Sequence, residues 1–171
     1  MEERKIALIP RLTVTAGLGP KDYGVLLTDQ RLILVMEKSS KSNVLVPALG
    51  LVGALIAEAA ATERGVDYMN ARPEQLACDE NNQCIPYASI ERLRLKRHYG
   101  GSIEMRLEHV RPDGKRKKIV GFLTIPDQLL EQKKASGMKF KDILEDYARR
   151  TQDVLRKTLP PGVQQHTEWF E

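Results

Sequence analysis

The segment Gly24–Val35, GVLLTDQRLILV, constrains the possible fold more than any other part of the chain. It contains two apolar runs on either side of the polar residues Thr-Asp-Gln-Arg, and a two-residue turn at Asp29 and Gln30 would pair these runs as a β-hairpin. The pairs set opposite each other are then Leu27 with Leu32 and Val25 with Leu34 on one face, and Leu26 with Ile33 on the other. Both faces are apolar, which is typical of strands that are covered on both sides.

The same segment carries a resemblance to a known family. The pattern Gly-apolar-apolar-Leu-Thr-Asp-x-Arg-Leu-Ile, which begins at Gly24, is similar to the early hairpin of GRAM-like and bacterial pleckstrin-homology-like (PH-like) domains. A second block, Ile-Pro-Tyr-Ala-Ser-Ile at 85–90 followed by Leu93 and Leu95, resembles the strand that opens the second half of the barrel in that superfamily. The resemblance covers residues 5–36 and 75–158. It implies a mainly β fold, a bent antiparallel barrel of about seven strands capped by a C-terminal helix, and no single function, because such barrels bind lipids, peptides and proteins alike.

The residue pattern in the later part of the chain predicts strands followed by a helix. Residues 103–110 alternate apolar and polar side chains, which indicates a strand with one buried and one solvent-facing side. The tetrapeptide Arg-Pro-Asp-Gly at 111–114 is a strong turn signal, and a further strand is expected over 115–124. Apolar residues at helical spacing predict a long amphipathic helix over 139–158, where the resemblance places the capping helix.

We expect residues 1–158 to form a single domain. Within it, residues 76–95 indicate a strand, a turn and a longer strand. Residues 159–171 form a C-terminal tail that is expected to be frayed. Its Trp169 and Phe170 either dock on the body of the protein or bind a partner.

A long insertion, residues 37–73, separates the two halves of the expected barrel. Its residues 44–57 carry no charge, and Pro47 and Gly65 suit the first turn and the C-terminal cap of a helix. A helix over 47–64 would be about 27 Å long with an uncharged part of about 20 Å, against about 30 Å for the apolar core of a bilayer. We therefore expect an inserted apolar helix that makes no full transmembrane span.

Three interpretations of this inserted helix remain open. It packs on its own barrel, it forms a homo-oligomer, or it lies in a membrane interface, although an interfacial helix should show one strongly polar face. Its apolar side chains point nearly all round, which favours burial against protein on several sides. Small residues at a spacing of four permit two such helices to approach closely. The candidate oligomer interface consists of Leu49, Gly50, Leu51, Gly53, Ala54, Leu55, Ile56 and Ala57.

The basic residues suggest a second candidate site. The chain carries a net charge of +4, with a pI of about 9.1, which favours anionic partners in general. The candidate anion- or membrane-binding residues, which the expected strands bring together, are Arg92, Arg94, Lys96, Arg106, Arg111, Lys115, Arg116, Lys117 and Lys118. Two interpretations stay open: a solvated hairpin partly neutralised by Glu104 and Glu108, or a surface for anionic lipid. Nucleic acid is disfavoured, because the chain lacks a basic recognition helix and aromatic residues among its cations.

No residue pattern identifies a reaction. His98 and His109 lie on expected strands without a nucleophile and an orienting acid at matched positions. Cys78 and Cys84 are expected to be reduced, with a disulfide across a hairpin as the alternative. Since a structural zinc ion normally needs four ligands, no metal site is expected. The beginning MEERKIALIP lacks the apolar core of a signal peptide, so secretion is not expected.

These observations lead to two hypotheses of different class, neither of them an enzyme and neither using a cofactor. The first is a PH-like binding module, cytoplasmic or peripheral at the membrane, whose partner is an anionic membrane surface or lipid headgroup. The second is a protein-interaction scaffold that forms homo-oligomers through the inserted helix.

Overall fold

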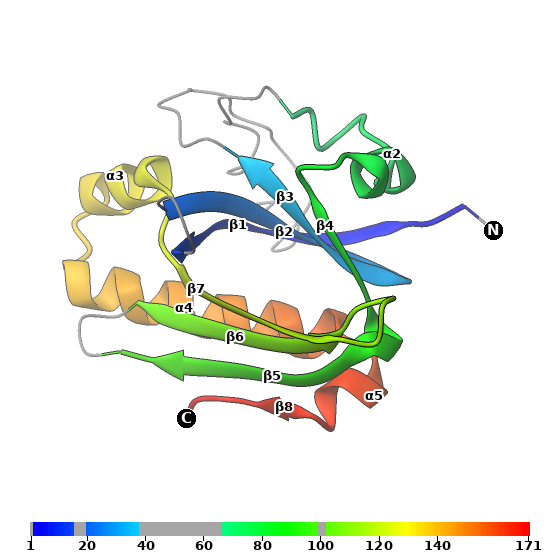
Figure 1. The fold of residues 1–171 in the computed structure, drawn as a ribbon. Helices are drawn as coiled ribbons and strands as arrows, with labels where there is room; N and C mark the ends of the chain where they lie inside the picture. Colours follow the sequence, from blue (N-terminus) through cyan, green and yellow to red (C-terminus); the bar gives the residue numbers. More distant parts are fainter. Residues whose placement is uncertain (1, 16–19, 38–65, 99–101) are drawn as a thin grey trace.

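The computed structural model of the chain describes residues 2–15, 20–37, 66–98 and 102–171. These residues form a mainly β structure with one open, mixed sheet of eight strands and a long C-terminal helix (Figure 1). The strands are β1 (Lys5–Thr15), β2 (Pro20–Thr28), β3 (Arg31–Glu37), β4 (Gln83–Pro86), β5 (Ile90–Arg97), β6 (Ile103–Val110), β7 (Arg116–Leu123) and β8 (Thr167–Glu168). The helices are α2 (Pro73–Cys78), α3 (Asp127–Ala135), α4 (Phe140–Thr158) and α5 (Pro161–Gln164), with a 3-10 turn η1 (Tyr87–Ser89).

The hairpin predicted over residues 24–35 is confirmed as strands β2 and β3. Its register pairs Leu27 with Leu32, Val25 with Leu34 and Leu26 with Ile33, as the two-residue turn requires. The hydroxyl oxygen of Thr28 fixes that turn, because it accepts hydrogen bonds from the backbone N–H groups of Gln30 and Arg31 at 3.1 and 2.9 Å.

Both faces of this hairpin are buried, as its two apolar faces predict. Leu27 and Leu32 belong to the main core, whereas Leu26 and Ile33 belong to a second, smaller core together with Tyr68. Strands β2 and β3 lie between these two cores and are therefore covered on both sides.

Strand β1 joins the two halves of the sheet. Its register against β2 shifts between Ile9 and Leu12, next to Pro10, and Arg11 has a positive φ of 58°. Beyond this bulge Leu12 pairs with Leu123, so that β1 hydrogen-bonds to β7 as well as to β2. The sheet order is consequently β4-β3-β2-β1-β7-β6-β5-β8.

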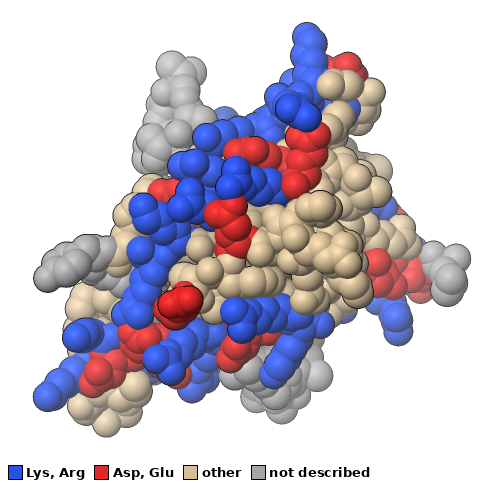
Figure 2. Space-filling model, turned by 90° about the horizontal axis from the view of Figure 1, so that it is seen from below, with Lys and Arg blue, Asp and Glu red and all other residues tan. Residues whose placement is uncertain are grey.

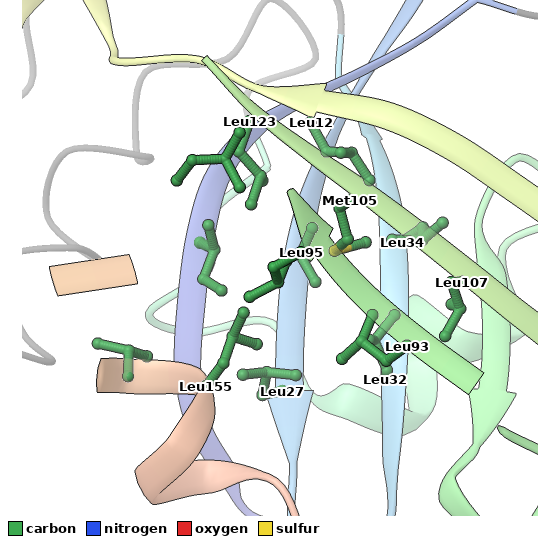
Figure 3. Close-up of a cluster of buried hydrophobic side chains, with 14 of the residues drawn as sticks. Leu12, Leu27, Leu32, Leu34, Leu93, Leu95, Met105, Leu107, Leu123 and Leu155 are labelled. Atoms are coloured by element: carbon green, nitrogen blue, oxygen red, sulfur yellow. The ribbon is translucent and has the colours of Figure 1, made fainter. Parts of the chain in front are cut away.

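Helix α4 packs its apolar stripe on the main core, and the predicted C-terminal helix is thereby confirmed. The stripe repeats at helical spacing, and Tyr147 and Leu155 are almost completely buried in it. Leu155 reaches toward Leu27 and Leu95 of the sheet (Figure 3). Phe140, which begins the helix, is 54% exposed and lies outside the packed part of the stripe.

The sheet is open, in contrast to the bent antiparallel barrel that the resemblance implies. Its edge strands are β4 and β8, and these two strands do not pair with each other. Strand β8 also pairs with β5 in parallel, so the sheet is mixed. The C-terminal residues are attached to the domain, because Leu159 and Val163 are buried and Trp169 and Phe170 pack against the main core. Docking on the body, rather than fraying, is thus the observed arrangement of this tail.

A second difference concerns the residues before β4. The strand expected to begin at residue 76 is instead the end of helix α2, and a turn over 79–82 leads into β4. Pro73 occupies the first turn of this helix, and the side chain of Gln75 accepts a hydrogen bond from the backbone N–H of Arg72 at 3.4 Å. Cys78 and Cys84 are both free thiols, as expected.

The inserted helix expected over 47–64 lies outside the described residues. Among the parts of the chain that the structure does describe, no helix combines the length and the apolar character needed to cross a bilayer.

Candidate functional site

The nine basic residues singled out in the sequence lie on or next to β5, β6 and β7. These strands are antiparallel neighbours, and the buried residues Leu93, Leu95, Met105 and Leu107 define their inner side. Because side chains alternate along a strand, the residues between them form the outer face of β5–β7. Cross-strand pairs on this outer face are Arg92 with Glu108, Arg94 with Arg106, Lys96 with Glu104 and Glu108 with Lys118.

Most arginines of this group are already paired with carboxylates. Arg92 and Arg94 both contact Glu168 of β8, with a separation of 3.2 Å between Arg94 Nε and Glu168 Oε2. The remaining pairs are Arg106 with Glu104 at 3.2 Å, Arg111 with Asp113 at 3.1 Å and Arg116 with Glu91 at 3.0 Å. Exposed ion pairs of this kind contribute little to stability, but they neutralise the charge that an outside anion meets.

Basic and acidic side chains consequently alternate over this side of the molecule. Figure 2, which looks at the protein from below, shows Lys and Arg interleaved with Asp and Glu instead of forming one unbroken basic area. The prediction of partial neutralisation by Glu104 agrees with its contacts: it accepts a hydrogen bond from Arg106 and lies 3.0 Å from His98 Nε2. The hydrogen bond with His98 is the largest of the influences that lower the pKa of Glu104.

The densest cationic segment is the basic hairpin, residues 111–118, all of which are exposed. Gly114 turns the chain with a φ of 77°, and its N–H donates to the carbonyl of Arg111 at 2.9 Å. The N–H of Lys115 donates to the carboxylate of Asp113 at 3.1 Å, so the turn is held by its own polar groups. Within the described parts of the chain, Lys115 and Lys118 have no carboxylate at ion-pair distance.

Lys117 differs from its neighbours, because the alternation of β7 turns it to the inner side. Its ammonium group donates to the side-chain oxygen of Gln83 in β4 at 2.8 Å. It also lies opposite His109, a buried side chain whose pKa is lowered by burial and then by the charge of Lys117. His109 is therefore neutral at pH 7, and its Nε2 atom has no hydrogen-bond partner among the described residues. The structure thus places eight of the nine cations on the outer face or its turn and places Lys117 on the inner side.

A buried carboxyl group that sequence reasoning missed lies at the end of β3. Glu37 is only 8% exposed, and burial raises its pKa to about 7. The hydroxyl of Tyr68 donates a hydrogen bond to it, and Gly24 leaves room for this pair, since a Cβ there would lie 2.5 Å from the Tyr68 oxygen. No local pattern distinguishes Glu37 from an ordinary strand-end charge, because its partner is 31 residues away.

The exposed lysines and arginines of the outer face and its turn are groups that can bind an anion. The hydroxyl next to Glu37 is that of the buried Tyr68, and His109 Nε2 has no hydrogen-bond partner among the described residues. Within residues 2–15, 20–37, 66–98 and 102–171, no group of three or more His, Cys, Asp or Glu side chains is placed to hold a metal ion. The eight residues of the predicted oligomer interface all lie outside these ranges, and that interface stays a prediction.

Comparison with known proteins adds no relative. No family model, no curated protein and no solved structure matches the chain.

Proposed function

We propose that this chain is a non-catalytic, PH-like binding module that associates with an anionic membrane surface through its basic hairpin. The observation that carries the proposal is the hairpin itself. Eight consecutive residues are exposed there, and they include two lysines with no carboxylate partner within the described structure. A turn of this kind can approach a flat, negatively charged surface without any rearrangement of the sheet.

The PH-like part of the proposal rests on the order of the strands. Strands β1 to β4 are sequential antiparallel neighbours, β5 to β7 form a second antiparallel unit, and β1 joins the two. After β7 and the short helix α3, the long helix α4 packs on the main core. The two antiparallel units and the C-terminal helix on the core support the PH-like interpretation.

Lipid is favoured over nucleic acid by the composition of the hairpin. A basic side chain close to an anionic bilayer contributes about 1 kcal/mol, and this attraction needs no specific geometry. Single-stranded nucleic acid is usually held by aromatic side chains set among the cations. Residues 111–118 contain no aromatic residue.

Co-sedimentation with vesicles tests the proposal. Wild-type protein should bind vesicles of phosphatidylcholine and phosphatidylglycerol at low salt, and should not bind phosphatidylcholine alone. The double variant Lys115→Ala, Lys118→Ala should lose about 2 kcal/mol of binding free energy, which is about thirtyfold in the partition coefficient. Raising the salt concentration should weaken the binding of the wild type, because exposed charges are screened.

The matched control removes two lysines at the opposite end of the molecule. Lys139 and Lys141 are exposed residues at the start of α4, far from the β6–β7 turn in Figure 1. Their replacement by alanine lowers the net charge by the same amount. Equal losses in the two double variants, or no binding by the wild type, would contradict the proposal.

A further inference from the structure

The carboxylate that pairs with both Arg92 and Arg94 comes from the chain's own C-terminal segment. Strand β8 pairs in parallel with β5, setting Glu168 beside Arg94. The carboxylate of Glu168 accepts hydrogen bonds from both Nε and a terminal nitrogen of Arg92, the first at 2.8 Å, and its other oxygen lies 3.2 Å from Arg94 Nε. One carboxylate therefore occupies the position between two guanidinium groups.

A third arginine faces the same place. Arg106 lies directly opposite Arg94, although like charges opposite each other on neighbouring strands are unfavourable. The charge of Arg106 also contributes to lowering the pKa of Glu168, after the larger effects of Arg92. The Nε atom of Arg106 has no hydrogen-bond acceptor among the described residues. A terminal nitrogen of Arg106 pairs with Glu104 at 3.2 Å, so the donor that neither carboxylate uses in this cluster is Arg106 Nε.

The C-terminal segment is held on both sides of Glu168 by polar contacts and by the rings of Trp169 and Phe170, which pack against the main core. The N–H of Leu93 donates to the carbonyl of His166 at 3.1 Å. The side-chain amide of Gln152 makes two hydrogen bonds with the backbone of Phe170, at 2.9 and 3.0 Å, and Arg156 lies 5.1 Å above the ring of Trp169. Anchors on both sides of Glu168 leave its own carboxylate, which is substantially exposed, able to exchange with another anion.

We propose that Glu168 is an internal ligand of an anion site formed by Arg92, Arg94 and Arg106, and that the phosphate groups of an anionic bilayer displace it. This inference rests on the proposed function, and it adds a second site of membrane contact to that of the basic hairpin. In this exchange two oxygens of a phosphate group replace the carboxylate oxygens of Glu168 at the same arginine donors. No buried side chain becomes exposed to solvent. The better Glu168 competes with the lipid phosphate for these arginines, the more the C-terminal segment weakens membrane binding.

The test compares two variants that change the charge of the same segment. Glu168→Gln removes the internal carboxylate, whereas Glu171→Gln makes the same change of net charge at an exposed residue without a described contact to the arginines. In sedimentation with phosphatidylcholine–phosphatidylglycerol vesicles, Glu168→Gln should bind about fivefold more tightly than Glu171→Gln, the change that corresponds to an exposed ion pair. Adding Arg92→Ala and Arg94→Ala to Glu168→Gln should abolish that gain.

Each other outcome has a separate meaning. Equal binding by Glu168→Gln and Glu171→Gln, with the wild type still bound, overturns this inference and leaves the proposed function standing. Absence of binding by every variant overturns both. Inorganic phosphate, added at constant ionic strength, should leave the gain unchanged, and loss of the gain would assign the site to free phosphate and overturn its assignment to the bilayer. The emission of Trp169, the single tryptophan of the chain, checks that the segment remains docked in each variant.

Discussion

Glu37 shows how one buried carboxyl group makes the stability of this fold depend on pH. It ends β3 close to Asp22, whose charge adds to the effect of burial, while the hydrogen bond from Tyr68 acts in the opposite direction. Burial has the largest effect, and it raises the pKa from 4.5 to about 7. The neutral form of this side chain is therefore the form that the folded protein prefers.

The sign of the pH dependence follows from proton binding. Between pH 4.5 and 7 the folded state keeps a proton on Glu37 that the unfolded chain has lost, so the free energy of unfolding falls as the pH rises through this range. The contribution of Glu37 is complete below pH 4.5 and lost above pH 7, a difference of about 3 kcal/mol. Glu37→Gln cannot ionise, and we expect it to match the wild type at pH 4.5 and to exceed it by up to about 3 kcal/mol at alkaline pH.

Urea unfolding at a series of pH values measures this difference. Glu80→Gln, a change at an exposed residue in the turn before β4, is the control and should follow the wild-type profile. A wild type and a Glu37→Gln variant whose stabilities run parallel over the whole pH range would show that Glu37 does not titrate with a raised pKa.

The β2–β3 hairpin is the element whose structure could be predicted best, because the residues that determine it are close together in the sequence. Turn length and the pairing of apolar residues determine its register, and both faces proved to be buried. The alternation in 103–110 predicted β6 for the same reason, and Met105 and Leu107 are buried as expected. Helix α2 was missed, although Pro73 and the Arg72–Gln75 capping interaction carry a local signal for it.

Elements and pairs that depend on distant residues could not be predicted. Strand β8 has two residues, and its position depends on β5, which lies more than 70 residues earlier in the chain. The ion pair between Arg92 and Glu168 joins residues 76 positions apart. The basic residues of the candidate site could therefore be named from the sequence, but their neutralisation by this strand could not.

Because both faces of the β2–β3 hairpin are buried, shortening an apolar side chain on either face should lower the free energy of unfolding. Leu26 faces the smaller core and is 1% exposed, and Leu26→Ala should lower the free energy of unfolding by about 2–5 kcal/mol. Leu27→Ala, on the opposite face, should cost a similar amount, whereas Gln30→Ala in the exposed turn should stay within about 0.5 kcal/mol of the wild type. Equilibrium unfolding in urea gives all three values. A Leu26→Ala variant as stable as Gln30→Ala would mean that this face is open to solvent.

At the scale of the whole molecule, the distribution of charge suggests a direction of approach to a bilayer. The basic hairpin lies at one end of the structure, and α3 with the beginning of α4 lies at the other end in Figure 1. On the outer face of β5–β7 the arginines are largely paired, so the lysines of the hairpin are the cations most available to an anionic surface. In the proposed membrane association, the basic hairpin therefore faces the bilayer.

A fluorescent label at either end of the molecule tests this orientation most directly. In a chain with Cys78→Ser and Cys84→Ser, an environment-sensitive dye is attached at Pro112→Cys in the basic hairpin or at Gln132→Cys in α3, both exposed positions. On addition of phosphatidylglycerol-containing vesicles, the emission of the dye at position 112 should shift to the blue, while the emission at position 132 should stay unchanged. A shift at position 132 without one at position 112 would contradict membrane association through the hairpin.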